Sequence, residues 1–202
     1  MDTNELKIVP YIRKNALHSS DPDFPVKIRF EILKRYTDLV CQGCIPSSLI
    51  VGQGGLGKTF LVTQRFKENR IRDITTLYND AMMNGTPLDH LAPGFVHVKG
   101  NTTPKGLYEL LYHNRGSQRI LLLDDCSRAF SDHMSLENLK AATDSYAERH
   151  VSWLKTNERI SEIPPSFVFE GRVIIITNRP LANIDPALRT RSACADITLT
   201  VS

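Results

Sequence analysis

The chain has 202 residues, of which 41% are hydrophobic and 23% charged, values typical of one folded globular domain and not of a disordered segment. Its formal net charge of +3 is too small to indicate nucleic-acid binding by itself. No stretch approaches the roughly 18 apolar residues of a membrane helix and the first residues lack a secretory signal pattern, so we expect a cytoplasmic protein without membrane contact, in a bacterium or a phage-infected host cell.

Apolar residues near helical spacing, with basic residues between them, predict a helix from Pro25 to Val40. We interpret residues 1–45 as an N-terminal segment that carries this basic amphipathic helix and packs on a core of residues 46–202. Leu49–Val51 predicts a short buried strand, and Thr59–Asn69 predicts the helix that follows it.

Gly94–Val98 has the composition of a second strand, and Pro104 suits the first turn of a helix that runs to about Tyr112. Arg119–Leu123 predicts a third strand, since its unbroken apolar run is typical of parallel strands buried on both faces. Ser135 is expected to cap a long helix to about Leu154.

Residues 159–171 are interpreted as a plain loop, with a β-hairpin as the alternative. Val173–Ile176 and Ile197–Val201 predict the fourth and fifth strands. Strands that alternate with helices indicate an α/β fold with a parallel sheet covered on both faces.

Cys41 and Cys44 have the spacing of half a zinc site or of a redox pair. The other two cysteines, Cys126 and Cys194, stand apart, so a second close pair is missing from the sequence. Reduced thiols are therefore the preferred interpretation, with zinc at Cys41 and Cys44 as the alternative.

Residues 52–59 match the phosphate-binding pattern G-x-x-x-x-G-K-[ST] completely, between a predicted strand and a predicted helix. Glycines let backbone N–H groups turn toward phosphates at the positive end of the following helix. Lys58 places a compact charge on the β- and γ-phosphates, and the Thr59 hydroxyl ligates Mg²⁺. The predicted ATP-binding residues are Gly52, Gln53, Gly54, Gly55, Leu56, Gly57, Lys58, Thr59 and Phe60.

The third predicted strand ends in two carboxylates, Asp124 and Asp125. We expect Asp124 to hold Mg²⁺ through its water shell, and Asp125 to polarise the attacking water as general base. The alternative is a strand that merely leaves the core in an acidic pair.

Asn178 follows the fourth predicted strand, where a side-chain amide could orient the lytic water or contact the γ-phosphate. Asn178 also has the setting of an ordinary turn residue, because Arg179 and Pro180 follow it. Arg189 and Arg191, just before the fifth predicted strand, suit an arginine finger that reaches a neighbouring subunit's γ-phosphate, with a pair of surface arginines as the alternative.

The order of these motifs resembles the AAA+ ATPase family over about residues 45–202. A Walker A loop at 52–59 and a Walker B strand at 120–125 precede a sensor-1 residue, Asn178, and an arginine-bearing segment at 186–192. Thr190-Arg191-Ser192 is similar to the Ser-Arg-Cys of clamp-loader ATPases, and Asp185-Pro-Ala-Leu looks like the stretch before the finger in many members. The segment from Phe167 to Asn178 looks like small ATPases encoded by bacteriophages and their hosts.

The resemblance implies a three-layer α/β/α sandwich with a five-stranded parallel sheet of order 5-1-4-3-2. It also implies bound ATP and Mg²⁺, and a homo-oligomeric ring, expected to be a hexamer, with active sites shared between subunits. Walker B usually ends Asp-Glu in this family, so the shorter Asp125 predicts slow hydrolysis. The helical lid with its sensor-2 arginine, which normally follows the fifth strand, is not found among these 202 residues, so we expect either a piece of a longer protein or another element that closes the site.

The loop after the second strand usually lines the pore of such rings, and it corresponds here to residues 98–103. Protein unfoldases tend to carry an aromatic residue there, whereas this loop has none. Lys99 and the nearby Lys105 suit phosphate contacts, so action on nucleic acid is the leading hypothesis. Solvated lysines without a partner are equally compatible with the loop. The functional alternatives are a protein-remodelling ATPase, a slow ATP-gated assembly switch and a small-molecule P-loop kinase.

Overall fold

The computed structural model describes residues 25–88, 91–153 and 163–199 of the chain. Its main sheet has five parallel strands in the order β2-β3-β6-β1-β7. Counted along the chain and read from the other edge, this is the order 5-1-4-3-2, so the predicted topology is confirmed. The strands are β1 (Ser47–Val51), β2 (Gly94–Lys99), β3 (Arg119–Asp124), β6 (Arg172–Thr177) and β7 (Ala193–Asp196).

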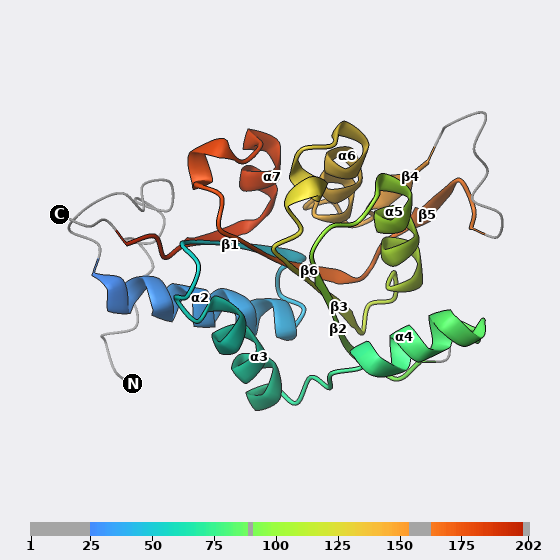
Figure 1. The fold of residues 1–202 in the computed structure, drawn as a ribbon, viewed down its shortest axis with the longest axis horizontal. Coiled ribbons are helices and arrows are strands. Elements are labelled where there is room, and N and C mark those ends of the chain that lie inside the picture. The colour runs from blue at the N-terminus through green and yellow to red at the C-terminus, as the bar shows by residue number, and fades with distance from the viewer. Residues whose placement is uncertain (1–24, 89–90, 154–162, 200–202) are drawn as a thin grey trace.

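Helices cover both faces of this sheet, which gives the predicted three-layer sandwich (Figure 1). Alternate strand residues enter opposite cores: Leu49 and Val51 pack in one cluster, and Ile50 packs in the other. Helices α2 (Val26–Cys41) and α3 (Lys58–Glu68) cover one face. Helices α5 (Pro104–His113), α6 (His133–Ala142) and α7 (Pro186–Arg191) cover the other face.

Helix α4 (Thr75–Asn84), beside the edge strand β2, was not predicted from the sequence. It buries only Tyr78 and Ala81, while Leu77, Met82 and Met83 are exposed. An apolar stripe this narrow produces a weak helical period in the sequence. Two short 3₁₀ turns, η2 (Ser127–Phe130) and η3 (Leu181–Asn183), lie between β3 and α6 and between β6 and α7.

The predicted long helix from Ser135 to Leu154 is wrong. Asp132 caps α6 by accepting a hydrogen bond from the Ser135 N–H at 2.9 Å, and the helix ends at Ala142. The chain then turns, and His150–Ser152 forms strand β4. Two residues of the predicted apolar stripe differ in burial: Val151 is buried, whereas Tyr146 is 75% exposed. Tertiary packing therefore split a pattern that looked continuous.

Strand β4 pairs antiparallel with β5 (Ser166–Val168) in a separate two-stranded sheet. The plain-loop interpretation of residues 159–171 is thus wrong at 166–168, which form a strand. The hairpin alternative is correct only in part, because the partner strand lies at 150–152, outside that segment. Residues 154–162 lie outside the described part. The second strand takes its register from Val151 opposite Phe167, both of which are buried in the core on the α5 side of the main sheet.

The fifth strand of the main sheet lies earlier than predicted, at Ala193–Asp196 instead of 197–201. Its register against β1 decides this, since Ser48 is opposite Ala193 and Val51 is opposite Asp196. Ile197 adds one further backbone hydrogen bond, to the Val51 carbonyl at 2.8 Å, and residues 200–202 lie outside the described part.

Helix α2 packs on the sheet through Leu33 and Val40, as its predicted apolar face requires. The division of the chain at residue 45 stays a prediction. Across the described ranges, no helix combines the length and apolarity needed to traverse a bilayer.

Candidate phosphate-binding and catalytic site

Three chemically distinctive segments meet at the carboxyl edge of the sheet. Strand β6 lies between β1 and β3, with Thr177 opposite Val51 and Ile176 opposite Asp124. The Gly52 N–H donates to the Thr177 carbonyl at 3.2 Å, which ties the start of the phosphate-binding loop to β6. Parallel strand order therefore brings residues 52–59, the Asp124–Asp125 pair and Asn178 to one edge.

The loop at 52–59 turns from β1 into α3 through left-handed glycines. Gly55 has φ 81° and Gly57 has φ 76°, and Gly57 is the N-cap residue of α3. A side chain at either position would be strained by that backbone conformation. Gly52 needs its missing side chain for another reason, because a Cβ atom there would lie 2.8 Å from Ile197 Cγ1. The loop thus has the backbone conformation that an inward-facing set of N–H groups requires.

Lys58 is buried within this loop, with 7% of its surface exposed. Its ammonium group donates to the carbonyls of Gly52 and Gln53, each at 2.7 Å. Burial lowers the pKa of Lys58, and the nearby carboxylates of Asp125 and Asp124 act in the opposite direction. The lysine is therefore held at the loop by contacts that phosphate oxygens can replace.

Asp124, also buried, is the acidic centre of the site. Its Oδ2 atom accepts a hydrogen bond from the Thr59 hydroxyl at 3.0 Å and lies 3.1 Å from Nε2 of His97. The sequence motifs linked Thr59 and Asp124 through a shared Mg²⁺, and the structure places their oxygen atoms in direct contact. Hydroxyl and carboxylate oxygens are the ligand type that Mg²⁺ prefers, so these two residues fit the metal.

His97 was not identified from the sequence. It lies on β2, opposite Leu122 of β3, and its backbone N–H donates to the Thr75 hydroxyl at 2.9 Å. In the sequence, β2 has the pattern of an ordinary edge strand. The one signal for a role of His97 in the site was its position in the strand next to the one that ends in the acidic pair. The contact depends on β2 and β3 being neighbours, as the strand order implied by the family resemblance places them.

Asp125 has an unusual backbone for a residue other than glycine, with φ 53° in the left-handed region. Its N–H donates to the Ile176 carbonyl at 3.0 Å, and the residue is exposed at the sheet edge. Strained conformations of this kind cluster at functional sites. Asn178 is also exposed, one residue beyond the end of β6, so both predicted polar side chains belong to adjoining strand ends.

Three other predicted ATP-binding residues, Gln53, Leu56 and Phe60, have features that the motif did not predict. The Gln53 side-chain amide donates to the Leu199 carbonyl at 2.8 Å and accepts from the Leu199 N–H at 2.9 Å. Phe60, in the first turn of α3, is 71% exposed. Leu56 packs against the core on the α2 side.

Arg189 and Arg191 lie at the amino ends of the parallel strands, opposite the carboxyl edge that carries the phosphate-binding loop. They end α7, and the Ser192 hydroxyl that follows accepts from Ser47 Oγ, at the start of β1, at 3.1 Å. Because a strand advances about 3.3 Å per residue, the span from Ser192 to Asp196 separates this edge from the phosphate-binding loop by roughly 13 Å. Arg191 forms an ion pair with Asp144 at 3.3 Å. Within one chain the arginines are therefore not brought together with the other predicted site residues.

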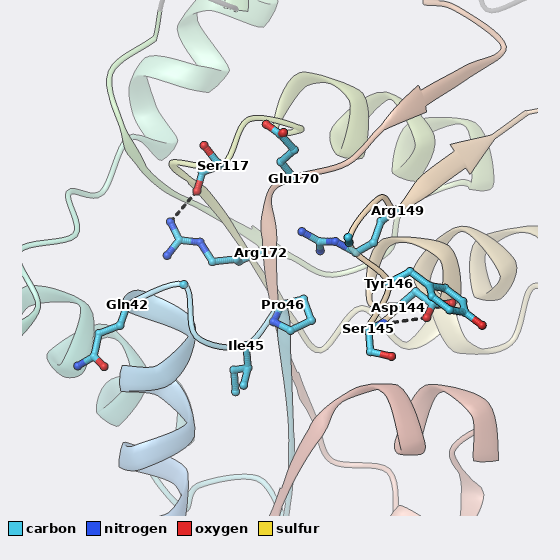
Figure 2. Close-up of a pocket in the computed structure, with 12 residues that line it drawn as sticks. Gln42, Ile45, Pro46, Ser117, Asp144, Ser145, Tyr146, Arg149, Glu170 and Arg172 are labelled. Carbon is cyan, nitrogen blue, oxygen red and sulfur yellow. Dashed lines mark hydrogen bonds between the residues drawn. The ribbon is translucent and has the colours of Figure 1, made fainter.

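A pocket of about 410 Å³ borders this arginine edge (Figure 2). Its lining includes Asp144 and two arginines, Arg149 and Arg172, whose pKa values are lowered by burial. Arg149 donates to the Ala142 carbonyl at 2.7 Å, and Arg172 donates to backbone carbonyls, including that of Ser117 at 2.9 Å. Through these hydrogen bonds, both guanidinium groups stabilise the backbone of neighbouring segments.

Lys99 ends β2 directly opposite Asp124 of β3, and Lys105 lies in the first turn of α5. Both residues are exposed, which phosphate contacts require but do not demonstrate. Cys44 is exposed, whereas Cys41 is buried, and burial raises the pKa of the Cys41 thiol to about 12. Among the described residues, no group of three or more His, Cys, Asp or Glu side chains is arranged to hold a metal ion.

Comparison with known proteins finds a phage relative. No protein-family model matches the chain. An uncharacterized 36.7 kDa protein from the nrdC–mobD intergenic region of Enterobacteria phage T4 is 31% identical over 174 residues, which cover 83% of this chain and 47% of that protein. The chain thus spans about half the length of this curated relative.

A solved structure of Rhizobiales Trip13 aligns with 87% of this chain and 60% of its own chain, at 16% identity and a TM-score of 0.31. A TM-score of this size does not demonstrate a shared fold, so no function is taken from it. The chain is therefore an α/β protein with a phage-encoded relative and a phosphate-binding-loop motif at the carboxyl edge of its sheet.

Proposed function

We propose that the protein is an Mg²⁺-dependent ATPase of the AAA+ type. The observation that carries this proposal is the meeting of the complete phosphate-binding motif, the Thr59–Asp124 contact and the exposed strand ends at Asp125 and Asn178. Such an arrangement offers phosphate binding, metal ligation and water activation at a single sheet edge.

Each residue has a role that follows from its chemistry. The N–H groups of the loop and of the first turn of α3 bind the β- and γ-phosphates, and Lys58 exchanges its two carbonyl partners for phosphate oxygens. Thr59 and Asp124 would hold Mg²⁺, which neutralises phosphate charge when bound. Asp125 takes the proton of the attacking water, and Asn178 orients that water.

Replacing Asp125 by Asn tests the chemical part of the proposal. The variant should bind ATP as the parent does, because the loop and the metal ligands are unchanged. Hydrolysis should fall by roughly 10²-fold or more, since an amide cannot act as the general base. ATP turnover and ATP affinity would be measured on the same samples.

Asp125→Glu is the matched variant. Its carboxylate reaches one methylene farther, so turnover should equal or exceed that of the parent. Normal hydrolysis by Asp125→Asn would remove Asp125 from the mechanism.

His97 is proposed as a positioning residue for Asp124, because its ring contacts the carboxylate oxygen that also accepts from Thr59. Loss of a group that orients a metal ligand typically weakens metal affinity by roughly 10- to 100-fold. His97→Ala should therefore need a correspondingly higher Mg²⁺ concentration for half-maximal hydrolysis, with little change in the maximal rate.

His133→Ala serves as control, because His133 is exposed on α6. Magnesium titrations of the ATPase would compare the two variants. An unchanged magnesium requirement in His97→Ala would contradict the positioning role.

We further propose that the ATPase assembles into a ring and acts on nucleic acid. Arg191 supports a shared active site, because it lies at the edge of the sheet opposite its own phosphate-binding loop and so can face a neighbour. The exposed, non-aromatic loop with Lys99 and Lys105 supports a phosphate-bearing substrate over an unfolded polypeptide.

A further inference from the structure

A second charged surface lies outside the site, where α3 ends beside the edge strand β2. Lys67, Arg70 and Arg72 line a hollow of about 440 Å³, together with Thr63, Asp73 and Phe95. We call this surface the basic groove. All three basic residues are exposed.

Neighbouring acids compensate the positive charge of the basic groove only in part, because Asp73 supplies one negative charge against the three cations that line it. Glu68 pairs with Arg65, and Asp73 accepts hydrogen bonds from the Thr75 N–H and hydroxyl at 2.9 and 2.6 Å. Across residues 25–88, 91–153 and 163–199, no ion pair is formed by Lys67, Arg70 or Arg72. The hollow is therefore lined by three cations whose donors remain available.

The backbone holds one of these cations, Arg70, at a conformational cost. Arg70 has φ 58°, in the left-handed region, just after α3 ends. The Ile71 N–H donates to the Phe66 carbonyl at 2.8 Å, which is the helix-ending turn that normally employs glycine or asparagine. An arginine occupies a position where glycine would fit better, which points to a use for its side chain.

The same backbone limits what can bind in the groove. The Phe95 N–H donates to the Arg72 carbonyl at 2.8 Å, and the Ile74 N–H donates to the Phe95 carbonyl at 3.0 Å. The outer edge of β2 is thus already paired there, so a peptide cannot be added as a further strand at this point. Phe95 is 4% exposed and packs against Phe66, so it does not provide a stacking surface for a base.

We infer that the basic groove binds the phosphodiester backbone of a nucleic acid strand without reading its sequence. Guanidinium groups match phosphate oxygens in two-point hydrogen bonds, and a lysine adds a point charge. The inference rests on the nucleic-acid part of the proposed function and adds a second contact surface to Lys99 and Lys105. It does not require ATP hydrolysis.

Fluorescence anisotropy with labelled oligonucleotides of one length tests the inference, using single-stranded DNA, single-stranded RNA and duplex DNA as separate probes. Arg70→Glu/Arg72→Glu should weaken binding at least roughly tenfold. The slope of log affinity against log salt should become shallower by roughly 1.4 for single strands or 1.8 for a duplex, as expected when two cations no longer meet phosphates. The probe that shows the larger loss identifies the preferred strand form.

Lys27→Glu/Arg35→Glu is the matched control, because it makes the same charge change at exposed positions of α2. It should retain binding within about twofold. Arg70→Gly guards against misfolding: glycine suits the left-handed backbone, so this variant should unfold at the same or a higher temperature and still bind more weakly.

Equal losses in the groove variant and the control would assign binding to overall charge and overturn the inference. So would competition by polyglutamate as effective as that by unlabelled DNA, or a loss seen only in Lys99→Glu/Lys105→Glu. Basal ATP hydrolysis measured on the same samples separates the two proposals. Hydrolysis without nucleic-acid binding overturns the groove and the nucleic-acid part of the proposed function but leaves the ATPase standing. Groove-dependent binding without hydrolysis supports the groove and contradicts the ATPase.

Discussion

Lys58→Ala is expected to remove most of the protein's affinity for ATP–Mg²⁺. The substitution deletes a buried ammonium group that already donates to two loop carbonyls at 2.7 Å and would otherwise meet the β- and γ-phosphates. Loss of a hydrogen bond to a charged group costs about 1.5–3 kcal/mol, which corresponds to roughly 10- to 100-fold in affinity for each bond. Because the ammonium group can donate to more than one phosphate oxygen, the whole effect should exceed this range.

Isothermal titration calorimetry with ATP–Mg²⁺ would measure the effect, and thermal unfolding would supply a second readout. ATP should raise the unfolding temperature of the parent but not of Lys58→Ala, because a ligand stabilises only a protein that binds it. Lys34→Ala is a suitable control, since Lys34 lies on α2 in a surface ion pair with Glu31. A Lys58→Ala protein that bound ATP as tightly as the parent would disprove the assignment of the loop.

Arg191→Ala is expected to bind ATP normally and to hydrolyse it poorly. Arginine fingers contribute roughly 10³-fold or more to phosphoryl transfer, because a fixed guanidinium stabilises the charge of the transition state. The structure places Arg191 at the edge of the sheet away from its own phosphate-binding loop, so any such contact must come from a neighbouring subunit. Hydrolysis should therefore rise with protein concentration.

Mixing two inactive variants gives the decisive measurement. Arg191→Ala still has an intact loop, and Lys58→Ala still has an intact arginine, so a mixture should regain part of the lost turnover. A mixture that co-assembles but stays inactive would contradict the shared site. Full activity of Arg191→Ala would do so as well, and Arg189→Ala would then be tested as the alternative finger.

Asp144→Asn is the control for the Arg191 experiments. It breaks the same ion pair, between Asp144 and Arg191, while leaving the guanidinium group in place. Both side chains of the pair are partly exposed, and ion pairs near the surface contribute about 1 kcal/mol or less to stability, so the fold should be retained. Turnover near that of the parent is expected from this variant.

Chemistry concentrated in short local patterns could be predicted from the sequence. The glycines of residues 52–59 allow the left-handed backbone that the turn from strand to helix requires. The buried strand before Asp124 can be recognised by its unbroken apolar run. These patterns depend on residues that are close together in the sequence, so they can be recognised without knowledge of the fold. The α/β class followed from their alternation, and the strand order followed from the family resemblance.

Features that depend on distant pairing needed the structure. The helix predicted to reach Leu154 ends at Ala142, because Val151 pairs with Phe167 across the β4–β5 hairpin. The last strand lies at Ala193–Asp196 because that segment pairs with β1. His97 contacts Asp124 because β2 and β3 are adjacent strands.

By itself, the sequence determined which residues are candidates to bind phosphate and metal, because glycine conformation and side-chain chemistry are local properties. Tertiary structure alone decided which edge of the sheet each residue occupies. It placed Asp125 and Asn178 beside the loop, Arg191 at the opposite edge, and the cations of the basic groove around one hollow. These positions depend on the direction and order of the strands, and packing among residues far apart in the chain sets both.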